Sequence, residues 1–541
     1  MSGDILKARL SRRSFIGSAA LGATALAAFP RLAFGQDAVA PVHGGTLTVN
    51  IGVEPPALVN LATSSGSGVY VTGKVTEGLL TYDFDLNPRP ELATSWSLSS
   101  DGLVYTFQLR PGVKWHDGRD FTSADVAFSI LTLKEVHPRG RTTFANVVEV
   151  REVSPTEVQI VLSQPAPYLI SALAASESPI VPKHVYEGGP APDAHPNAAA
   201  PIGTGPFVFR EWVRGSHLIL ERNPDYWDAP KPYLDRLIVR FIGDAAAGAV
   251  ALETGEVQLA TGAVSLSDVE RLRALPHLGF ETRGYSYVNA VSRIEFNLDN
   301  PFLGNLLVRK AIAHSIDKSF INDTIFLGYG QIIPGPISPW LTRFYVPDLP
   351  TYAFDTARAN ALLDEAGFPR NANGVRFSLN HDPLPGGDPY RRTGEYLRQA
   401  LRDVGIDVTI RSQDFAAYVT RVYTDRDFDF TFNGMSNLFD PTVGVQRLYW
   451  SQNFRPGVPF SNGSHYSNPE VDRLLEAAAV EVDPEVRLQQ FDAFQRIIVD
   501  ELPDIGINAP DAFTIFDRRV HNHTIGADGF GNNGAEIFIT A

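Results

Sequence analysis

The chain of 541 residues exceeds the roughly 250–300 residues at which one hydrophobic core stops growing, so we expect at least two lobes. Hydrophobic residues make up 44% and charged residues 20%, a balance typical of globular and not of disordered proteins. The formal net charge of −15 disfavours nucleic acid and anionic lipid as partners, and the absence of cysteine excludes disulfides, thiol nucleophiles and thiolate metal sites.

Residues 1–36 have the features of an export signal. The pair Arg12-Arg13 precedes a mildly apolar run, Gly17–Phe29, as in twin-arginine signals. This run is shorter than the about 20 residues of a membrane span, and Ala33-Phe34-Gly35 is typical of a cleavage site. We therefore expect a soluble periplasmic protein without membrane insertion and, since cysteine is absent, without a lipid anchor. An uncleaved anchor is the alternative.

The next part of the chain is rich in strand signals. Gly45–Ile51 alternates polar and apolar residues, which predicts the start of a first sheet. Short alternating runs between Tyr82 and Phe121 predict a small β-rich unit, and Thr122–Asp125 has the spacing of a helix-capping box. Pro179–Pro206 has the composition of a connector, after which strand alternation resumes over 207–221.

Helix signals become dense in the second half. Asp355 is placed to cap a helix that stops at Gly367, and the helical run Tyr396–Val404 precedes a strand at Asp407–Arg411. Alternation of helices and strands predicts a second α/β lobe. Ser467–Glu470 has the spacing of another capping box, whose helix carries an apolar stripe.

Motifs that would indicate an enzyme or a metal site have simpler interpretations. Gly68–Val75 has the spacing of a phosphate-binding loop but places Val where a magnesium-binding hydroxyl is required, so we interpret it as a structural loop. His116-Asp117 is part of a hairpin turn that continues into Gly118. His521 and His523 share one face of a strand without a third ligand nearby in sequence. We expect no catalytic residue, metal or cofactor.

A loop after a predicted strand is the candidate binding site. In Asp427–Phe432 three phenylalanines alternate and predict a strand that ends before Asn433. Ligands of open α/β sheets lie beyond the carboxyl ends of strands, which is the position of Gly434–Thr442. Its polar side chains Asn437 and Asp440 are therefore candidate ligand contacts, with a plain loop as the alternative.

Several segments together resemble one known family, and the similarity covers nearly the whole chain after the signal. They are Val75–Tyr82, Pro90–Trp96, Leu109–Asp125, Pro201–Phe207, Asn223–Trp227, Val308–Ile312 and Ser467–Leu475. In these segments the chain resembles the extracellular solute-binding proteins of family 5, which comprises oligopeptide, dipeptide and nickel receptors of ATP-driven (ABC) importers.

The resemblance implies an α/β fold, the two-lobed clamp of periplasmic binding proteins of the cluster C type, with an extra β-rich subdomain inserted in the first lobe. On this basis we expect lobe 1 over 37–290, with the insertion at about 80–200. Lobe 2 is expected over 291–508, and 509–541 should return to lobe 1. The hinge strands are expected near Tyr285–Asn297 and Ile505–Asp511. Tyr285 and Tyr287 are expected on the first crossing strand, facing the cleft or its floor.

The resemblance also implies a function and partners. The expected function is that of a monomeric periplasmic receptor, not an enzyme, which binds a peptide or peptide-like small molecule and delivers it to an ABC transporter permease. In peptide-binding relatives an aspartate often holds the ligand's free amine three residues before the Asp-Pro of this loop, and here Asn437 stands in that place. A non-peptide solute (an opine, a sugar-like molecule or a metal chelate) is therefore one alternative. Two further alternatives are a permease-independent binding or chaperone protein, and a hydrolase.

Overall fold

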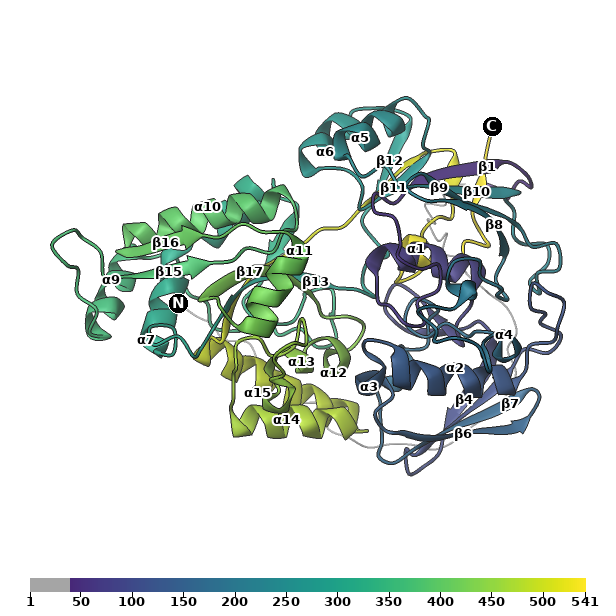
Figure 1. The fold of residues 1–541 in the computed structure, drawn as a ribbon, viewed down its shortest axis with the longest axis horizontal. Coiled ribbons are helices and arrows are strands. Elements are labelled where there is room, and N and C mark those ends of the chain that lie inside the picture. The colour runs from purple at the N-terminus through teal and green to yellow at the C-terminus, as the bar shows by residue number, and fades with distance from the viewer. Residues whose placement is uncertain (1–38) are drawn as a thin grey trace, which may run out of the picture. The chain divides into compact units, whose positions relative to one another are not determined.

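The computed structural model describes residues 39–541, and residues 42–541 form one compact unit. The expected signal segment, residues 1–36, lies outside the described residues. Strands and helices are mixed throughout the described chain, so the expected α/β class is confirmed (Figure 1). Three sheets of four or more strands organise the unit.

A mixed seven-stranded sheet combines the start, the middle and the end of the chain. Its strand order is β12-β19-β11-β1-β10-β9-β8, and β1 runs parallel to both of its neighbours. Its strands are β1 (Thr46–Asn50), β8 (Phe207–Val213), β9 (His217–Arg222), β10 (Arg236–Arg240), β11 (Leu259–Thr261), β12 (Leu278–Glu281) and β19 (Thr514–Asp517). The accompanying helices are α1 (Gly66–Val75), α5 (Ala245–Glu253) and α6 (Leu266–Arg273).

A four-stranded antiparallel sheet lies between β1 and β8 in sequence. Its order is β4-β5-β7-β6, formed by β4 (Ala93–Leu98), β5 (Val104–Leu109), β6 (Val147–Ser154) and β7 (Glu157–Leu162). Helix α2 (Ser123–Val136) begins with the predicted capping box, in which the Asp125 carboxylate accepts the Thr122 N–H at 2.9 Å. Nearby are α3 (Gly140–Thr143), α4 (Lys183–Tyr186) and the hairpin of β2 (Leu80–Tyr82) and β3 (Pro88–Pro90).

The second half of the chain forms a six-stranded sheet. Its order is β14-β18-β13-β17-β15-β16, with central strand β13 antiparallel to both neighbours. The strands are β13 (Ala290–Phe296), β14 (Gly330–Ile332), β15 (Phe377–His381), β16 (Ile406–Ile410), β17 (Phe430–Ser436) and β18 (Asp504–Pro510). The helices include α7 (Leu306–Ser315), α8 (Lys318–Phe320), α9 (Thr356–Glu365), α10 (Asp388–Asp403), α11 (Phe415–Val419), α12 (Pro441–Gly444), α13 (Gln446–Tyr449), α14 (Pro469–Val480) and α15 (Pro484–Glu501).

Separate hydrophobic clusters support these sheets. The cluster beside the six-stranded sheet contains Ile294, Phe296 and Phe432, whereas α14 and α15 pack through a second cluster with Leu475 and Phe494. Two further clusters include the buried apolar residues of the four-stranded and the seven-stranded sheets. Burial of each large apolar side chain contributes about 1.5–3 kcal/mol, so each sheet has its own source of stability.

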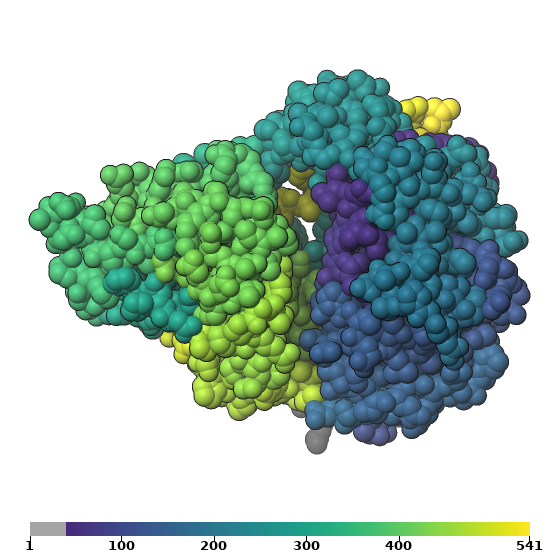
Figure 2. Space-filling model, viewed as in Figure 1, coloured from purple at the N-terminus to yellow at the C-terminus, as the bar shows by residue number. Residues whose placement is uncertain are grey.

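The chain passes between the two large sheets twice. Residues 282–289 connect β12 to β13, and residues 511–513 connect β18 to β19, after which the short pair β20 (Val520–His521) and β21 (Phe538–Ile539) completes the chain. The space-filling view is hollowed between the green part of the chain and the purple residues near α1 (Figure 2). These two connections are therefore the places to look for a site built from both sheets.

Three local predictions were wrong. Strand β17 begins at Phe430 and continues past Asn433 to Ser436, because its backbone pairs with β13 along this whole length. The buried Asn433 amide is satisfied by Glu295 at 2.7 Å. The predicted loop at Gly68–Val75 is helix α1, capped by the Ser65 side chain. The capping residue of α14 is Asn468 and not Ser467, since the Asn468 side chain accepts the first free N–H groups.

Candidate functional site

Two cavities adjoin the crossing segments. The first has a volume of about 860 Å³ and the second about 420 Å³, within the range of small-molecule sites. They share lining residues from both crossings, namely Gly284, Tyr285, Val288, Asp511 and Ala512. The first cavity is also lined by the β2–β3 turn, by 340–344 and by the connection between α14 and α15.

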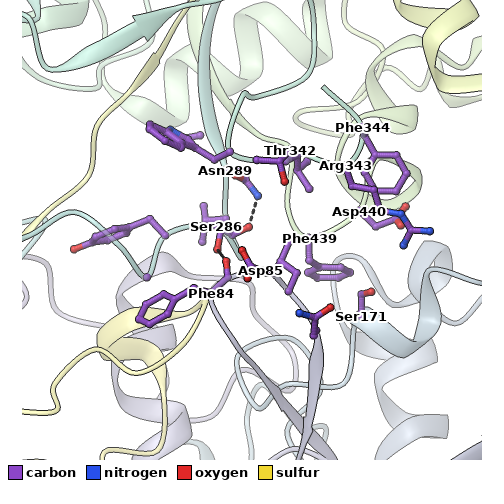
Figure 3. Close-up of a pocket in the computed structure, with 18 of the residues that line it drawn as sticks. Phe84, Asp85, Ser171, Ser286, Asn289, Thr342, Arg343, Phe344, Phe439 and Asp440 are labelled. Atoms are coloured by element: carbon purple, nitrogen blue, oxygen red, sulfur yellow. Dashed lines mark hydrogen bonds between the residues drawn. The ribbon is translucent and has the colours of Figure 1, made fainter. Parts of the chain in front are cut away.

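Hydrogen bonds connect the first crossing to the β2–β3 turn and to the loop after β17. The Ser286 hydroxyl donates to the Phe84 carbonyl at 3.2 Å, and the Asn289 amide donates to the Ser286 carbonyl (Figure 3). The same amide donates to the Leu438 carbonyl at 3.0 Å. The wall of the first cavity is therefore formed by backbone segments that are held in place by side-chain amide and hydroxyl groups.

Asp440 lines the first cavity but has protein partners on both carboxylate oxygens. It caps α12 by accepting the Thr442 N–H at 2.9 Å. The Arg487 guanidinium donates to it twice, at 2.9 and 2.7 Å, and both side chains are about 5% exposed. The carboxylate thus orders the turn, and its negative charge is compensated within the protein.

Asn437 is fully buried and is absent from the described linings of both cavities. Its Oδ1 accepts the Ser338 N–H at 2.6 Å, and its Nδ2 donates to the Pro336 carbonyl at 3.2 Å. In this geometry the amide holds the backbone of 336–338 against the end of β17.

The two tyrosines of the first crossing lie in an irregular segment and not on a strand. Tyr285 lines both cavities, and its hydroxyl bonds the hydroxyls of Thr261 at 3.1 Å and Thr514 at 2.7 Å. Tyr287 lines the second cavity, donates to the Ser171 carbonyl at 3.0 Å and stacks on Tyr82 with ring centroids 5.4 Å apart. Burial raises the pKa of both phenols, so both remain neutral hydrogen-bonding groups.

Two arginines that line the cavities are paired with carboxylates. Arg139 donates to both oxygens of Glu177, with Nε at 3.0 and 3.1 Å. Burial by itself would raise the pKa of Glu177, but the charge of Arg139 and its hydrogen bonds hold it below its ordinary value. Arg283 forms a two-pronged pair with Glu281 at 2.9 and 2.6 Å. Neither guanidinium therefore offers an uncompensated charge to a solute.

Two charged side chains differ from these pairs. Asp511 is half-buried, lines both cavities and accepts no hydrogen bond or ion pair from any residue in 39–541. Burial raises its pKa, and no nearby charge opposes this shift. Arg343 is exposed in the first cavity, and within the described chain it has no carboxylate within ion-pair distance. Neither residue was nominated from the sequence, although Asp511 lies in the predicted second crossing at the end of an apolar strand.

The histidine pair near the C-terminus has aromatic partners. His521 stacks on Phe538 at 4.7 Å, and His523 lies 4.1 Å from the Phe516 ring. In the described part of the chain, His, Asp and Glu form no group of three that is suited to a metal ion. Among residues 39–541, no helix is both long and apolar enough to cross a membrane.

Comparisons with known proteins agree with this architecture. The model of the bacterial extracellular solute-binding proteins, family 5 Middle, matches residues 87–457. A Brucella ovis protein named as an ABC transporter peptide-binding protein is 30% identical over 494 residues, 88% of each chain. The glutathione-binding protein GsiB of Salmonella typhi is 27% identical over 527 residues, 95% of each chain.

A solved structure extends the comparison to the fold. The ABC transporter-associated periplasmic binding protein DppA of Helicobacter pylori, in complex with the peptide STSA, is 25% identical with a TM-score of 0.79. The match covers 92% of this chain and 99% of that one. This chain therefore belongs to family 5 of the bacterial extracellular solute-binding proteins and has their two-lobed α/β fold.

Proposed function

We propose that this chain is the receptor of an ABC importer and binds a peptide or peptide-like small molecule in the two cavities at the crossing segments. The observation that carries the proposal is two opposite charges in a cavity of about 860 Å³, Asp511 and Arg343, neither of which has an ion-pair partner among residues 39–541. A peptide has an ammonium and a carboxylate, so it complements both charges. The relatives named for peptide and glutathione binding support the same class of solute.

The proposal includes the route of the protein and its partners. Residues 1–36 direct export to the periplasm by the twin-arginine pathway, the exported chain is a soluble monomer without lipid anchor, and a permease receives the solute from it. It performs no catalysis of its own. Replacement of Arg12 and Arg13 by Lys should leave precursor in the cytoplasm, and normal periplasmic amounts of that variant would refute the export route.

Solute binding is proposed to close two lobes about the crossing segments. Lobe 1 comprises 37–290 and the return segment 509–541, lobe 2 comprises 291–508, and the insertion covers about 80–200. The two connections at 282–289 and 511–513 support this division, because few backbone links join the two large sheets. Small-angle scattering should give a smaller radius of gyration with solute, and an unchanged radius with verified saturation would contradict closure.

A non-peptide solute is the second candidate function. It is favoured by the partners of Asn437 and Asp440, because these two candidate ligand contacts already bond to Ser338 and Arg487. An opine, a sugar-like molecule or a metal chelate would then occupy the same cavities.

One experiment separates these candidates. The protein is purified without refolding, denatured, and the released small molecules are identified by mass spectrometry; calorimetry then confirms rebinding. A peptide with micromolar or tighter affinity is the expected result. A rebinding molecule without a peptide bond would establish the second candidate, and the absence of any rebinding molecule would contradict a receptor function.

A further inference from the structure

The carboxylates around the two cavities differ in whether a cation or a hydrogen-bond donor of the protein balances their negative charge. Six of them line one or both cavities: Asp85, Glu177, Asp440, Glu481, Asp511 and Asp528. Arginines pair with Glu177 and Asp440, and Glu481 accepts the Asp483 N–H at 2.8 Å. Asp85 is exposed, so water solvates it.

Asp528 is partly compensated as well. Burial raises its pKa to about 6, but the positive charge of Lys74 opposes that shift. The Lys74 ammonium donates at 2.6 Å to the Asn532 carbonyl, in the same C-terminal segment. Asp528 therefore has a cation of the protein in its electrostatic environment, whereas Asp511 has none that affects its pKa.

Asp511 is left as a half-buried carboxylate without a partner in the described chain. Removal of a carboxylate from water costs free energy unless a cation or a hydrogen-bond donor replaces the water. Its position on the lining shared by both cavities makes it accessible to a solute in either one. A bound cation would supply the missing compensation.

The second cavity has walls suited to a cation. Tyr70, Tyr285 and Phe513 line it together with Asp511, and the faces of aromatic rings attract ammonium and guanidinium groups within about 6 Å. The one arginine of its described lining, Arg139, is paired with Glu177, so no free guanidinium of the protein competes there for Asp511.

We propose that Asp511 anchors a positively charged group of the solute, an ammonium or a guanidinium, at the lining shared by the two cavities. This inference rests on the proposed function as a receptor and assigns the solute class to organic cations, including peptides with a free amine. The cation replaces the remaining water around a half-buried carboxylate and lies beside aromatic rings.

The test compares the parent with Asp511→Asn and with Asp193→Asn, which removes an exposed carboxylate outside both cavities. The probes are a set of dipeptides with a free amine, the same dipeptides N-acetylated, and agmatine, a guanidinium compound without a peptide bond. Affinities are measured by calorimetry and melting temperatures by fluorimetry. Asp511→Asn should weaken binding of the cationic probes about ten- to a hundredfold, and Asp193→Asn should leave it unchanged.

A loss of fold cannot imitate this result. Because burial raises the pKa of Asp511, removal of its charge should leave the melting temperature of the empty protein unchanged or higher. Equal binding of free and N-acetylated dipeptides by the parent, or unchanged affinity in Asp511→Asn, would overturn the inference while peptide binding itself stands. Agmatine binding that requires Asp511, without dipeptide binding, would support the inference and remove peptides from the proposed function. Absence of binding by every cationic probe would overturn it.

Discussion

The ends of two strands in the six-stranded sheet carry polar residues with opposite environments. After β17, Asn437 and Asp440 are buried and fully engaged with Ser338 and Arg487. After β18, Asp511 is half-buried and has no partner in the described chain. Both β17 and β18 run antiparallel to β13, so both positions follow a strand at the same edge of the sheet. Their location alone therefore does not separate a structural group from a ligand contact.

The difference shows that charge compensation distinguishes a ligand contact from a structural group better than position after a strand does. A buried carboxylate with a bidentate arginine has its charge balanced before a solute arrives, so a solute gains little from it. A desolvated carboxylate without a cation gains more from a positively charged solute. Substitutions at the engaged residues should therefore change stability, and a substitution at Asp511 should change binding.

The largest effect is expected from Arg487→Met. It leaves Asp440 buried and unpaired, which should lower the free energy of unfolding by about 3–5 kcal/mol. Equilibrium unfolding in urea measures the loss. Arg473→Met, which removes an exposed arginine, is the control and should change stability by no more than about 0.5 kcal/mol. Equal stability of the two variants would contradict a structural role for the Asp440–Arg487 pair.

Asn437→Asp should have the next largest effect. The carboxylate replaces a donor with an acceptor opposite the Pro336 carbonyl, so we expect a loss of about 1–3 kcal/mol. Because the side chain is buried away from both cavities, the new carboxylate should not improve binding of dipeptides with a free amine. Urea unfolding and calorimetry measure both quantities. Stronger dipeptide binding with unchanged stability would show that this loop contacts the solute.

Glu77 extends the comparison to a buried carboxylate held by neutral donors. It accepts the Tyr226 hydroxyl at 2.7 Å and the Trp227 indole N–H at 3.0 Å. Burial raises the pKa of Glu77 from 4.5 to about 7, so its protonated form contributes stability that is fully present below about pH 4.5 and is lost as the pH rises through about 7.

Glu77→Gln should therefore flatten the dependence of stability on pH in this interval. Urea midpoints are measured below pH 4.5, between pH 4.5 and about 7, and above pH 7. Glu485→Gln, at an exposed glutamate, should retain the slope of the parent. A parent-like slope in Glu77→Gln would show that another group accounts for the pH dependence.

The smallest effect on stability is expected from Arg343→Gln. The guanidinium is exposed and has no carboxylate partner in the described chain, so the free energy of unfolding should change by no more than about 0.5 kcal/mol. Binding of a dipeptide should weaken relative to its C-terminal amide, because the ligand carboxylate loses a charged donor. Equal losses for the acid and the amide would exclude contact between Arg343 and the carboxylate.

Part of the local structure could be predicted from the sequence. Turn and cap signals such as Thr122–Asp125 depend on neighbouring residues, so they could be predicted from sequence alone. The end of β17 could not, because β17 continues past Asn433 by pairing with β13, which is remote in sequence.

The same limit applies to the candidate contacts. Asp440 had the composition and position of a ligand contact, but its partner Arg487 is 47 residues away. Asp511 stands at the end of an apolar strand in a predicted crossing, and its lack of a partner among residues 39–541 depends on side chains that are remote in sequence. Charge compensation is a tertiary property, so a sequence pattern does not report it.

The central claim is that the solute occupies the cavities at the two crossing segments. Hydrogen–deuterium exchange of the purified chain, with and without the solute recovered from it, tests this directly. The account predicts slower exchange in 84–88, 282–290 and 511–513, which line the first cavity or connect the two sheets. Protection confined to segments outside both cavities, such as the surface of α2 and residues 187–192, would contradict it.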